Sequence, residues 1–277
     1  MTNAISRRFA LAGALLFPSV TVAAEGPFAA LEKQSGARIG VAALDTGSGK
    51  RIAWRADERF VMCSTFKLSL AAAILAKADK GGEQLDRLVR YGADVPIGLS
   101  LFTSKNVARG MTIVELCEAA VLVSDNGAAN LLLDSLGGPE ALTHFWRTIG
   151  DSITRLDDKE LKLNIPDGER NTTTPIAMLG DLKALLLGEV LAPASRARLL
   201  GWMRACTTGV NRLHAGLPPA WLWGDKTGTN EPRYGSVNDI GIATPPGRSP
   251  ILMVCYTEKC SEKTVAAVGN ILAEAFA

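Results

Sequence analysis

A serine and a lysine three residues apart open a long apolar segment of this 277-residue chain. Ser64 and Lys67 precede the almost wholly apolar run 68–76, which predicts a buried helix. Side chains three apart on a helix are about 5–6 Å apart between Cβ atoms, so the amine can reach the hydroxyl. Burial can lower the pKa of a lysine far enough for it to activate a serine nucleophile. The pattern therefore indicates nucleophilic catalysis, with a helix cap and an edge lysine as the purely structural alternative.

Three further short motifs supply the other groups that such chemistry needs. Ser124-Asp125-Asn126 lies between two helical segments, and Lys226-Thr227-Gly228-Thr229 ends an apolar strand. Glu160 and Asn164 lie in the long polar segment 155–173, and loops of that length are often functional. Singly, these are a turn, a strand end and a solvated carboxylate. In this order, S-x-x-K, S-D-N and K-T-G are a recorded catalytic set, so we expect them to meet at one site.

The elements that must position these groups are strands at both ends of the chain and helices between them. Helices are expected at 26–36, 64–81, 111–123, 127–136, 139–149, 174–187 and 261–277, and strands at 37–44, 51–54, 222–229, 239–244 and 251–257. Thr112 with Glu115, and Thr174, are candidate helix N-caps. This order predicts an α+β fold, with a mainly antiparallel five-stranded sheet flanked by helices. We expect an α/β lobe from residues 25–59 and 204–277, and an inserted all-helical lobe at 60–203.

The N-terminus has the features of an export signal. Arg7 and Arg8 precede a short apolar stretch and the small residues Ala23-Ala24, and this apolar stretch is too short for a stable membrane span. The paired arginines fit a twin-arginine or an ordinary secretory signal. We expect cleavage near Ala24, release to the periplasm or outside the cell, and no membrane anchor. Without the two arginines, the 30 basic residues fall to 28, equal to the 28 acidic ones, so the charge predicts no nucleic-acid partner.

Cysteine and histidine usage argues against a metal enzyme. The two histidines, His144 and His214, have no neighbouring ligand pattern, so we expect neither a metal nor another cofactor. The cysteines are odd in number and widely spaced, which is not typical of a disulfide framework. They are Cys63, Cys117, Cys206, Cys255 and Cys260.

With these motifs in place, the chain closely resembles the class A serine β-lactamases. The resemblance covers nearly the whole chain after the signal segment. It also includes Tyr91-Gly92, Gly110-Met111-Thr112, Asn130-Leu131-Leu132-Leu133, Gly137-Gly138-Pro139, Thr172-Thr173-Thr174-Pro175 and Asn238-Asp239-Ile240. It implies the two-lobed fold shared with penicillin-binding proteins, hydrolysis of penicillins or cephalosporins through a serine acyl-enzyme, and antibiotic resistance. The implied partner is a small-molecule β-lactam, and we expect a monomer.

The resemblance also implies a role for each motif residue. Ser64 would be the nucleophile, Lys67 its proton partner, and Ser124 the relay to the departing lactam nitrogen. Glu160, with Asn164, would activate the water that hydrolyses the acyl-enzyme. The backbone N–H groups of Ser64 and Thr229 would form the oxyanion hole. The expected substrate-binding residues are Asn126, Asn164, Arg212, Lys226, Thr227, Gly228 and Thr229.

The sequence departs from the family pattern at several places. Asp158 and Asn171 stand where the family has an arginine and an aspartate that form an ion pair, and the loop is about two residues shorter near Ile165. Asn230 stands where class A carbapenemases have a cysteine that pairs with the counterpart of Cys63, so we expect no such disulfide. Val237 replaces a common carboxylate-binding arginine, and Arg212 stands where other members supply one.

Three other functions fit parts of the pattern. A penicillin-binding transpeptidase or carboxypeptidase shares three motifs, and a β-lactam sensor acylates without fast deacylation. Glu160 with Asn164 argues against both, because hydrolysis of the acyl-serine needs a base that holds water. A serine-type glutaminase is disfavoured by the export signal. Hydrolysis of a chromogenic cephalosporin would separate these alternatives.

Overall fold

The computed structural model describes residues 26–277, so the expected export signal at 1–24 lies outside the described residues. The helices are α1 (Pro27–Ser35), α2 (Phe66–Asp79), α3 (Ile113–Leu122), α4 (Asn126–Leu136), α5 (Pro139–Thr148), α6 (Pro175–Leu187), α7 (Pro193–Arg204) and α8 (Glu262–Phe276). Short 3₁₀ helices are η1 (Cys63–Thr65), η2 (Lys162–Asn164) and η3 (Leu213–Gly216). The strands are β1 (Arg38–Asp45), β2 (Arg51–Trp54), β3 (Phe60–Val61), β4 (Leu88–Val89), β5 (Met111–Thr112), β6 (Thr172–Thr173), β7 (Leu222–Thr229), β8 (Val237–Thr244) and β9 (Ile251–Glu258).

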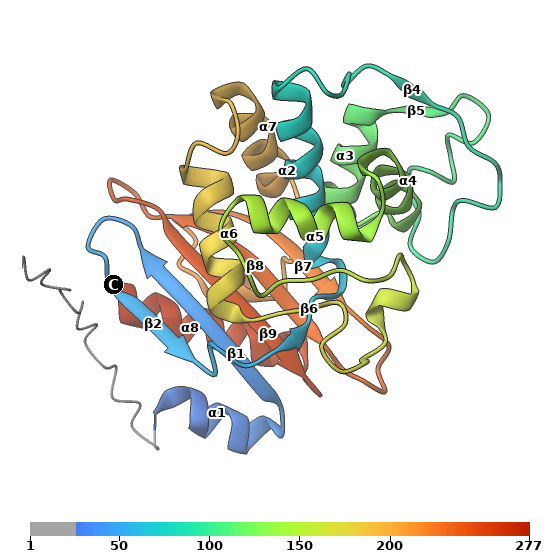
Figure 1. Cartoon of the computed structure of the whole chain (residues 1–277). Helices are drawn as coiled ribbons and strands as arrows, with labels where there is room; N and C mark the ends of the chain where they lie inside the picture. The colour runs from blue at the N-terminus through green and yellow to red at the C-terminus, as the bar shows by residue number, and fades with distance from the viewer. Residues whose placement is uncertain (1–25) are drawn as a thin grey trace, which may run out of the picture.

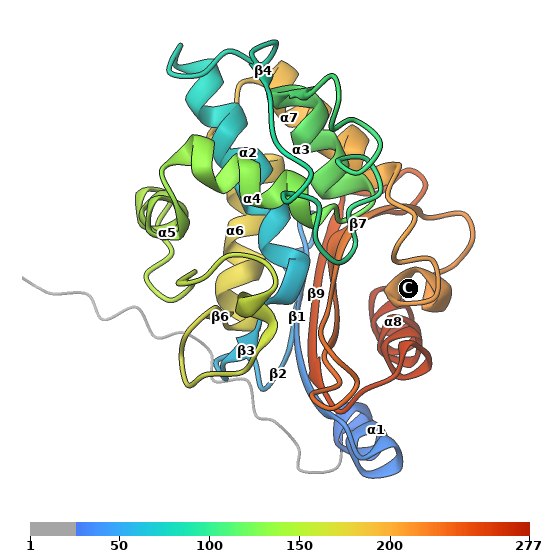
Figure 2. The same cartoon turned by 90° about the vertical axis from the view of Figure 1, so that its right-hand side faces the viewer.

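The main sheet joins the two ends of the chain. Its order is β2-β1-β9-β8-β7, and every neighbouring pair is antiparallel. Helices α1 and α8 cover one face, and the remaining α-helices lie on the other (Figures 1 and 2). The predicted α+β class and five-stranded sheet are confirmed. The division into lobes at the predicted boundaries stays a prediction.

Strand β1 is buried on both faces because helices cover both sides of the sheet. Ile39, Val41 and Ala43 pack with α8, whereas Ala42 and Leu44 pack with the larger helical core. This alternation follows from the two-residue period of a strand. A sheet packed on both sides resists distortion, so its edge strand β7 is a firm support for side chains.

The two predicted caps are present. Thr112 and Glu115 form a capping box at the start of α3, and the Thr174 side chain accepts a hydrogen bond from Ala177 N in α6. The sequence predicts no separate helix at 193–204, where the structure has α7. Few of its residues are apolar and buried, among them Leu199, Trp202 and Met203, which left a weak periodic signal.

Candidate active site

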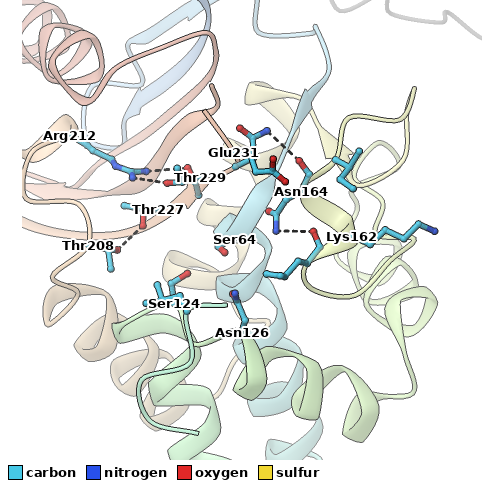
Figure 3. Close-up of a pocket in the computed structure, with 15 residues that line it drawn as sticks. Ser64, Ser124, Asn126, Lys162, Asn164, Thr208, Arg212, Thr227, Thr229 and Glu231 are labelled. Carbon is cyan, nitrogen blue, oxygen red and sulfur yellow. Dashed lines mark hydrogen bonds between the residues drawn. The ribbon is translucent and has the colours of Figure 1, made fainter. Parts of the chain in front are cut away.

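Ser64 lies in the 3₁₀ turn η1, two residues before the first residue of the α-helix α2, Phe66. The expectation that the α-helix includes Ser64 is therefore wrong, because Cys63 has φ 49°, in the left-handed region that an α-helix excludes. The Asn238 side chain donates hydrogen bonds to Val61 O (2.9 Å) and Met62 O (3.3 Å), fixing the turn on the sheet. Gly228 permits this approach, since a Cβ there would lie 2.6 Å from Met62 O. The turn presents Ser64 to the cavity (Figure 3).

Lys67 is fully buried in the first turn of α2. Its Nζ donates to Ser124 O at 2.8 Å and to Asn126 Oδ1 at 2.5 Å. It forms an ion pair with Glu160 Oε1 at 2.9 Å, and both side chains are 0% exposed. Burial lowers the pKa of Lys67, and the Glu160 carboxylate opposes that shift. The predicted proton partner of Ser64 is thus held in a buried polar cluster.

Glu160 connects the nucleophile to this cluster. Ser64 Oγ donates to Glu160 Oε1 at 3.1 Å, while Asn164 Nδ2 donates to Glu160 Oε2 at 2.6 Å. Asn130 on α4 fixes the backbone, because its side chain bonds both the N–H and the C=O of Glu160 at 3.0 Å. Sequence reasoning placed Asn130 only within a family motif and gave it no role. The sequence feature that could have indicated this role is an amide side chain within a predicted helix, since an amide can bond both a backbone N–H and a backbone C=O.

Ser124 lies between the two buried lysines. Lys226 Nζ donates to Ser124 Oγ at 3.0 Å, and Lys67 Nζ lies 3.5 Å from the same oxygen. Ser124 has φ 61°, and a left-handed conformation of this kind costs on the order of 1–3 kcal/mol for a non-glycine residue. Burial lowers the pKa of Lys226 to about 8, helped by the positive charge of Lys67. The hydroxyl can therefore exchange protons with either lysine.

Asp125, between Ser124 and Asn126, has a structural role that sequence reasoning did not assign. Its carboxylate accepts hydrogen bonds from the backbone N–H groups of Phe102 and Thr103 and from the Thr103 hydroxyl. It also caps α4 by accepting from Ala128 N at 2.9 Å. Asp125 thereby holds the 90–110 loop against α4.

Arg212 lies beside the end of β7. Its guanidinium donates to Thr229 Oγ1 at 2.7 Å and to Gly228 O at 3.1 Å (Figure 3). It also donates to Asn238 O at 2.7 Å. Glu262 at the start of α8 accepts from its Nε at 3.2 Å. Because Thr229 Oγ1 accepts from Arg212, the Thr229 hydroxyl hydrogen is free to point to a ligand in the cavity. The structure thus brings Arg212 to the predicted site.

These groups surround a cavity of about 500 Å³. The predicted residues Ser64, Ser124, Asn126, Asn164, Arg212, Thr227, Gly228 and Thr229 line it, and Lys67, Glu160 and Lys226 contact the lining residues from beneath. Residues that sequence reasoning missed as lining are Leu161, Lys162, Ile165, Thr208 and Glu231, of which Lys162 begins η2 and the others lie on loops. Among them, Thr208 bonds the Thr227 hydroxyl at 2.6 Å. One pocket therefore holds a nucleophile, proton-transfer groups and cations for an anionic ligand.

The loop that carries Glu160 contains ion pairs that the sequence did not predict. Asp158 pairs with Arg170 and Lys162, each at 2.8 Å, and accepts from Asn171 Nδ2 at 3.0 Å. Burial raises the pKa of Asp158, but the bonds from Lys162, Asn171 and Arg170 outweigh it and lower the pKa to about 2. The family's arginine–aspartate pair is absent at these positions, as expected, but the loop is not left without charge pairing.

The cysteines are all free thiols, which confirms that Cys63 forms no disulfide. Asn230 occupies the place of the missing cysteine. Its side chain bonds Asn164 O at 3.3 Å and Ser236 Oγ at 3.1 Å, so it links the end of β7 to the Glu160 loop. A polar bridge therefore joins these segments. Within residues 26–277, no group of three or more histidine, cysteine or acidic side chains is placed to bind a metal ion.

Comparisons with known proteins agree with this geometry. A profile of the family described as "Beta-lactamase enzyme family" matches residues 25–276. The chain is 46% identical over 93% of its length to β-lactamase AST-1 of Nocardia asteroides, covering 83% of that protein. It is 45% identical over 90% of its length to the carbapenem-hydrolysing β-lactamase KPC of Klebsiella oxytoca, covering 87% of that protein.

Solved structures show the same likeness. An ancestral class A β-lactamase of Gram-negative bacteria superposes with a TM-score of 0.87 at 53% identity, over 90% of this chain and 98% of that one. A putative class A β-lactamase from Rhodopseudomonas palustris gives 0.86 at 49% identity, over 89% and 97%.

The Asp158 cluster should stabilise the folded state in a pH-dependent way. A carboxyl whose folded pKa is depressed contributes stability above its unfolded pKa and loses it as pH falls through the folded value. We expect Asp158→Asn to cost about 1 kcal/mol at pH 7, since its partners are partly exposed, and the difference from wild type to shrink between pH 4 and 2. Urea unfolding across this range measures it. Asp167→Asn, a more exposed carboxylate of the same loop, is the matched control, and equal costs for both variants would contradict the assignment.

Proposed function

The chain belongs to the class A β-lactamases, enzymes that hydrolyse β-lactam antibiotics and confer resistance, and we propose that its buried polar cluster makes and hydrolyses the serine acyl-enzyme. The observation that carries this proposal is the chain of contacts Ser64–Glu160–Lys67 together with Asn164 on the same carboxylate. It supplies a nucleophile, a proton acceptor and a water-positioning amide within hydrogen-bond reach of one another.

Acylation begins when Ser64 Oγ attacks the lactam carbonyl. Its proton passes to the buried Lys67–Glu160 pair, whose charged atoms lie 2.9 Å apart. The new oxyanion is stabilised by the backbone N–H groups of Ser64 and Thr229, and one such donor is typically worth about 2.7–4 kcal/mol. As the C–N bond breaks, Ser124 donates its proton to the ring nitrogen and is reprotonated from Lys67 or Lys226, both within 3.5 Å.

Deacylation uses the other side of the same cluster. Glu160 accepts a proton from a water that Asn164 also contacts, and the resulting hydroxide attacks the ester of Ser64. The collapse of the second tetrahedral intermediate breaks the Ser64 Oγ–acyl bond, and Ser64 regains its proton from the cluster. Bonds from Asn130 to the Glu160 backbone and from Asn230 to Asn164 O support this geometry.

Binding of the substrate falls to the cations and amides around the cavity. Lys226, Thr227 and Thr229 bind the ring carboxylate, with Arg212 acting on it through Thr229. Gly228 lets β7 approach the nucleophile turn closely. Asn126 holds the acyl side-chain amide as well as Lys67.

We also propose that segment 1–24 directs export, with cleavage near Ala24 and release to the periplasm or outside the cell as a monomer. The support is the sequence pattern alone. In the described part of the chain, no helix has the length and apolar content needed to cross a membrane.

The direct test of this function is hydrolysis of benzylpenicillin and a chromogenic cephalosporin by the mature protein. We expect steady turnover with no metal added, unchanged by a chelator. A single burst equal to the enzyme concentration, followed by no turnover, would identify a sensor or a penicillin-binding protein instead. Activity that a chelator removes and zinc restores would refute the serine mechanism.

Lys226 should give activity an alkaline limit. Its pKa of about 8 means that it is cationic at pH 7 and mostly neutral at pH 9, when it no longer attracts the substrate carboxylate. We expect kcat/KM to fall by about tenfold between pH 7 and 9. Lys226→Arg keeps its charge throughout and should move this limit upward. An unchanged limit in Lys226→Arg would assign the titration to another group.

Arg212 should contribute binding more than chemistry. Arg212→Ala removes the donor to Thr229 Oγ1, so KM for benzylpenicillin should rise more than kcat falls, the pattern of lost uniform binding. Arg212→Lys is the matched control that retains charge. If Arg212→Ala leaves kcat/KM unchanged while remaining folded, Arg212 has only a structural role.

A further inference from the structure

A second cavity lies between α2, α5 and the loop that joins α6 to α7, and the proposed mechanism does not use it. Its volume is about 640 Å³, larger than that of the active-site cavity, and the two share no lining residue. Figures 1 and 2 show α5 on the outside of the molecule, across α2. Ser64 lies just before the first turn of α2, and the cavity lies along its C-terminal half, so the two are at opposite ends of one helix.

The floor of this cavity is apolar. Ala76 and Ala141 leave room because their side chains are a single methyl, and Phe145 and Val190 are larger apolar residues of the same lining. Phe145 and Val190 are only partly buried against the core, so their remaining apolar surface faces water. Covering such surface with an apolar ligand is favourable by about 25 cal/mol per Å². A cavity of this size is typical of small-molecule sites.

The rim is predominantly basic. Lys77, Lys80 and His144 line the cavity, and Glu189 is the one acidic side chain among its lining residues. Within residues 26–277, the side chains of Lys80, His144 and Glu189 form no ion pair or hydrogen bond, while Lys77 Nζ donates to Ser135 O at 3.1 Å. Lysines near a helix C-terminus interact favourably with the helix dipole, which accounts for Lys77 and Lys80 at the end of α2. The dipole does not account for the apolar hollow beside them.

We propose that this cavity is a second ligand site, which takes an amphipathic organic anion: a carboxylate or sulfonate head on a hydrocarbon or aryl body. The apolar body covers Ala76, Ala141 and Phe145, and the head pairs with Lys80. A neutral apolar ligand would form no ion pair with the lysines, and a cationic ligand would be repelled by them. Charge complementarity therefore selects the anion.

The test measures binding of decanoate, below its critical micelle concentration, to the mature protein by calorimetry. We expect saturable binding at one site and much weaker binding of decyltrimethylammonium, which has the same chain and the opposite charge. Lys80→Glu should weaken decanoate binding by about three- to tenfold, as expected for an exposed charge contact. Lys105→Glu, the same change at an exposed residue that lines neither cavity, should leave it unchanged.

Two further measurements locate the ligand. Ala141→Leu fills the hollow and should abolish binding, and alanine-methyl NMR of the wild type should show shifts at Ala76 and Ala141. The active-site cavity is the competing location, since Lys226 and Arg212 could also attract an anion. The proposal would be overturned by methyl shifts confined to alanines near Ser64, or by equal binding of the two decyl ligands. It would also be overturned by wild-type affinity for decanoate in Lys80→Glu, or in an Ala141→Leu variant that remains folded.

Discussion

The ion pair between Lys67 and Glu160 is the interaction on which the rest of the site depends. Both side chains are fully buried, and their charged atoms are 2.9 Å apart. Removing two charges from water is costly, and their mutual attraction repays it only when further hydrogen bonds satisfy the remaining donors and acceptors. Here Ser124 O and Asn126 Oδ1 accept from Lys67, while Ser64 and Asn164 donate to Glu160. The pair is therefore stable only as part of the complete cluster.

This requirement explains how the surrounding elements are arranged. The apolar helix α2 excludes water from Lys67, and α4 holds the Glu160 backbone through Asn130. Within the Glu160 loop, Asp158 forms ion pairs with Arg170 and Lys162. Asn230, at the end of β7, donates a hydrogen bond to Asn164 O of the same loop. Helix α2 and the Glu160 loop, which are separated in the sequence, thus each supply one partner of the ion pair. Losing either partner would leave a buried charge uncompensated, which typically costs about 3–5 kcal/mol.

The sequence predicted the sheet, most helices and the residues of the cluster, because these depend on periodicity and on motifs with fixed spacing. It did not predict the 3₁₀ turn at Ser64, since the left-handed φ of Cys63 occurs where the turn contacts β7 and β8, which are distant in the sequence. The Asp158–Arg170 pair joins residues twelve apart through the folding of an irregular loop. Thr208 reaches Thr227 from a separate loop. Such contacts depend on tertiary geometry, which no local pattern encodes.

The measurement that tests the account most directly is intact-protein mass spectrometry of Glu160→Ala after mixing with benzylpenicillin. In Glu160→Ala, Lys67 remains to accept the Ser64 proton in acylation, while deacylation loses the base that holds the water. The loss of Glu160 should therefore slow deacylation by about 10²–10⁴-fold and acylation far less. We expect a covalent adduct of one substrate mass on Ser64 that lasts minutes or longer. Wild type sampled after the substrate is consumed, and Glu160→Ala combined with Ser64→Ala, should show none. Turnover of Glu160→Ala at the wild-type rate without a lasting adduct would contradict the central role of the buried pair.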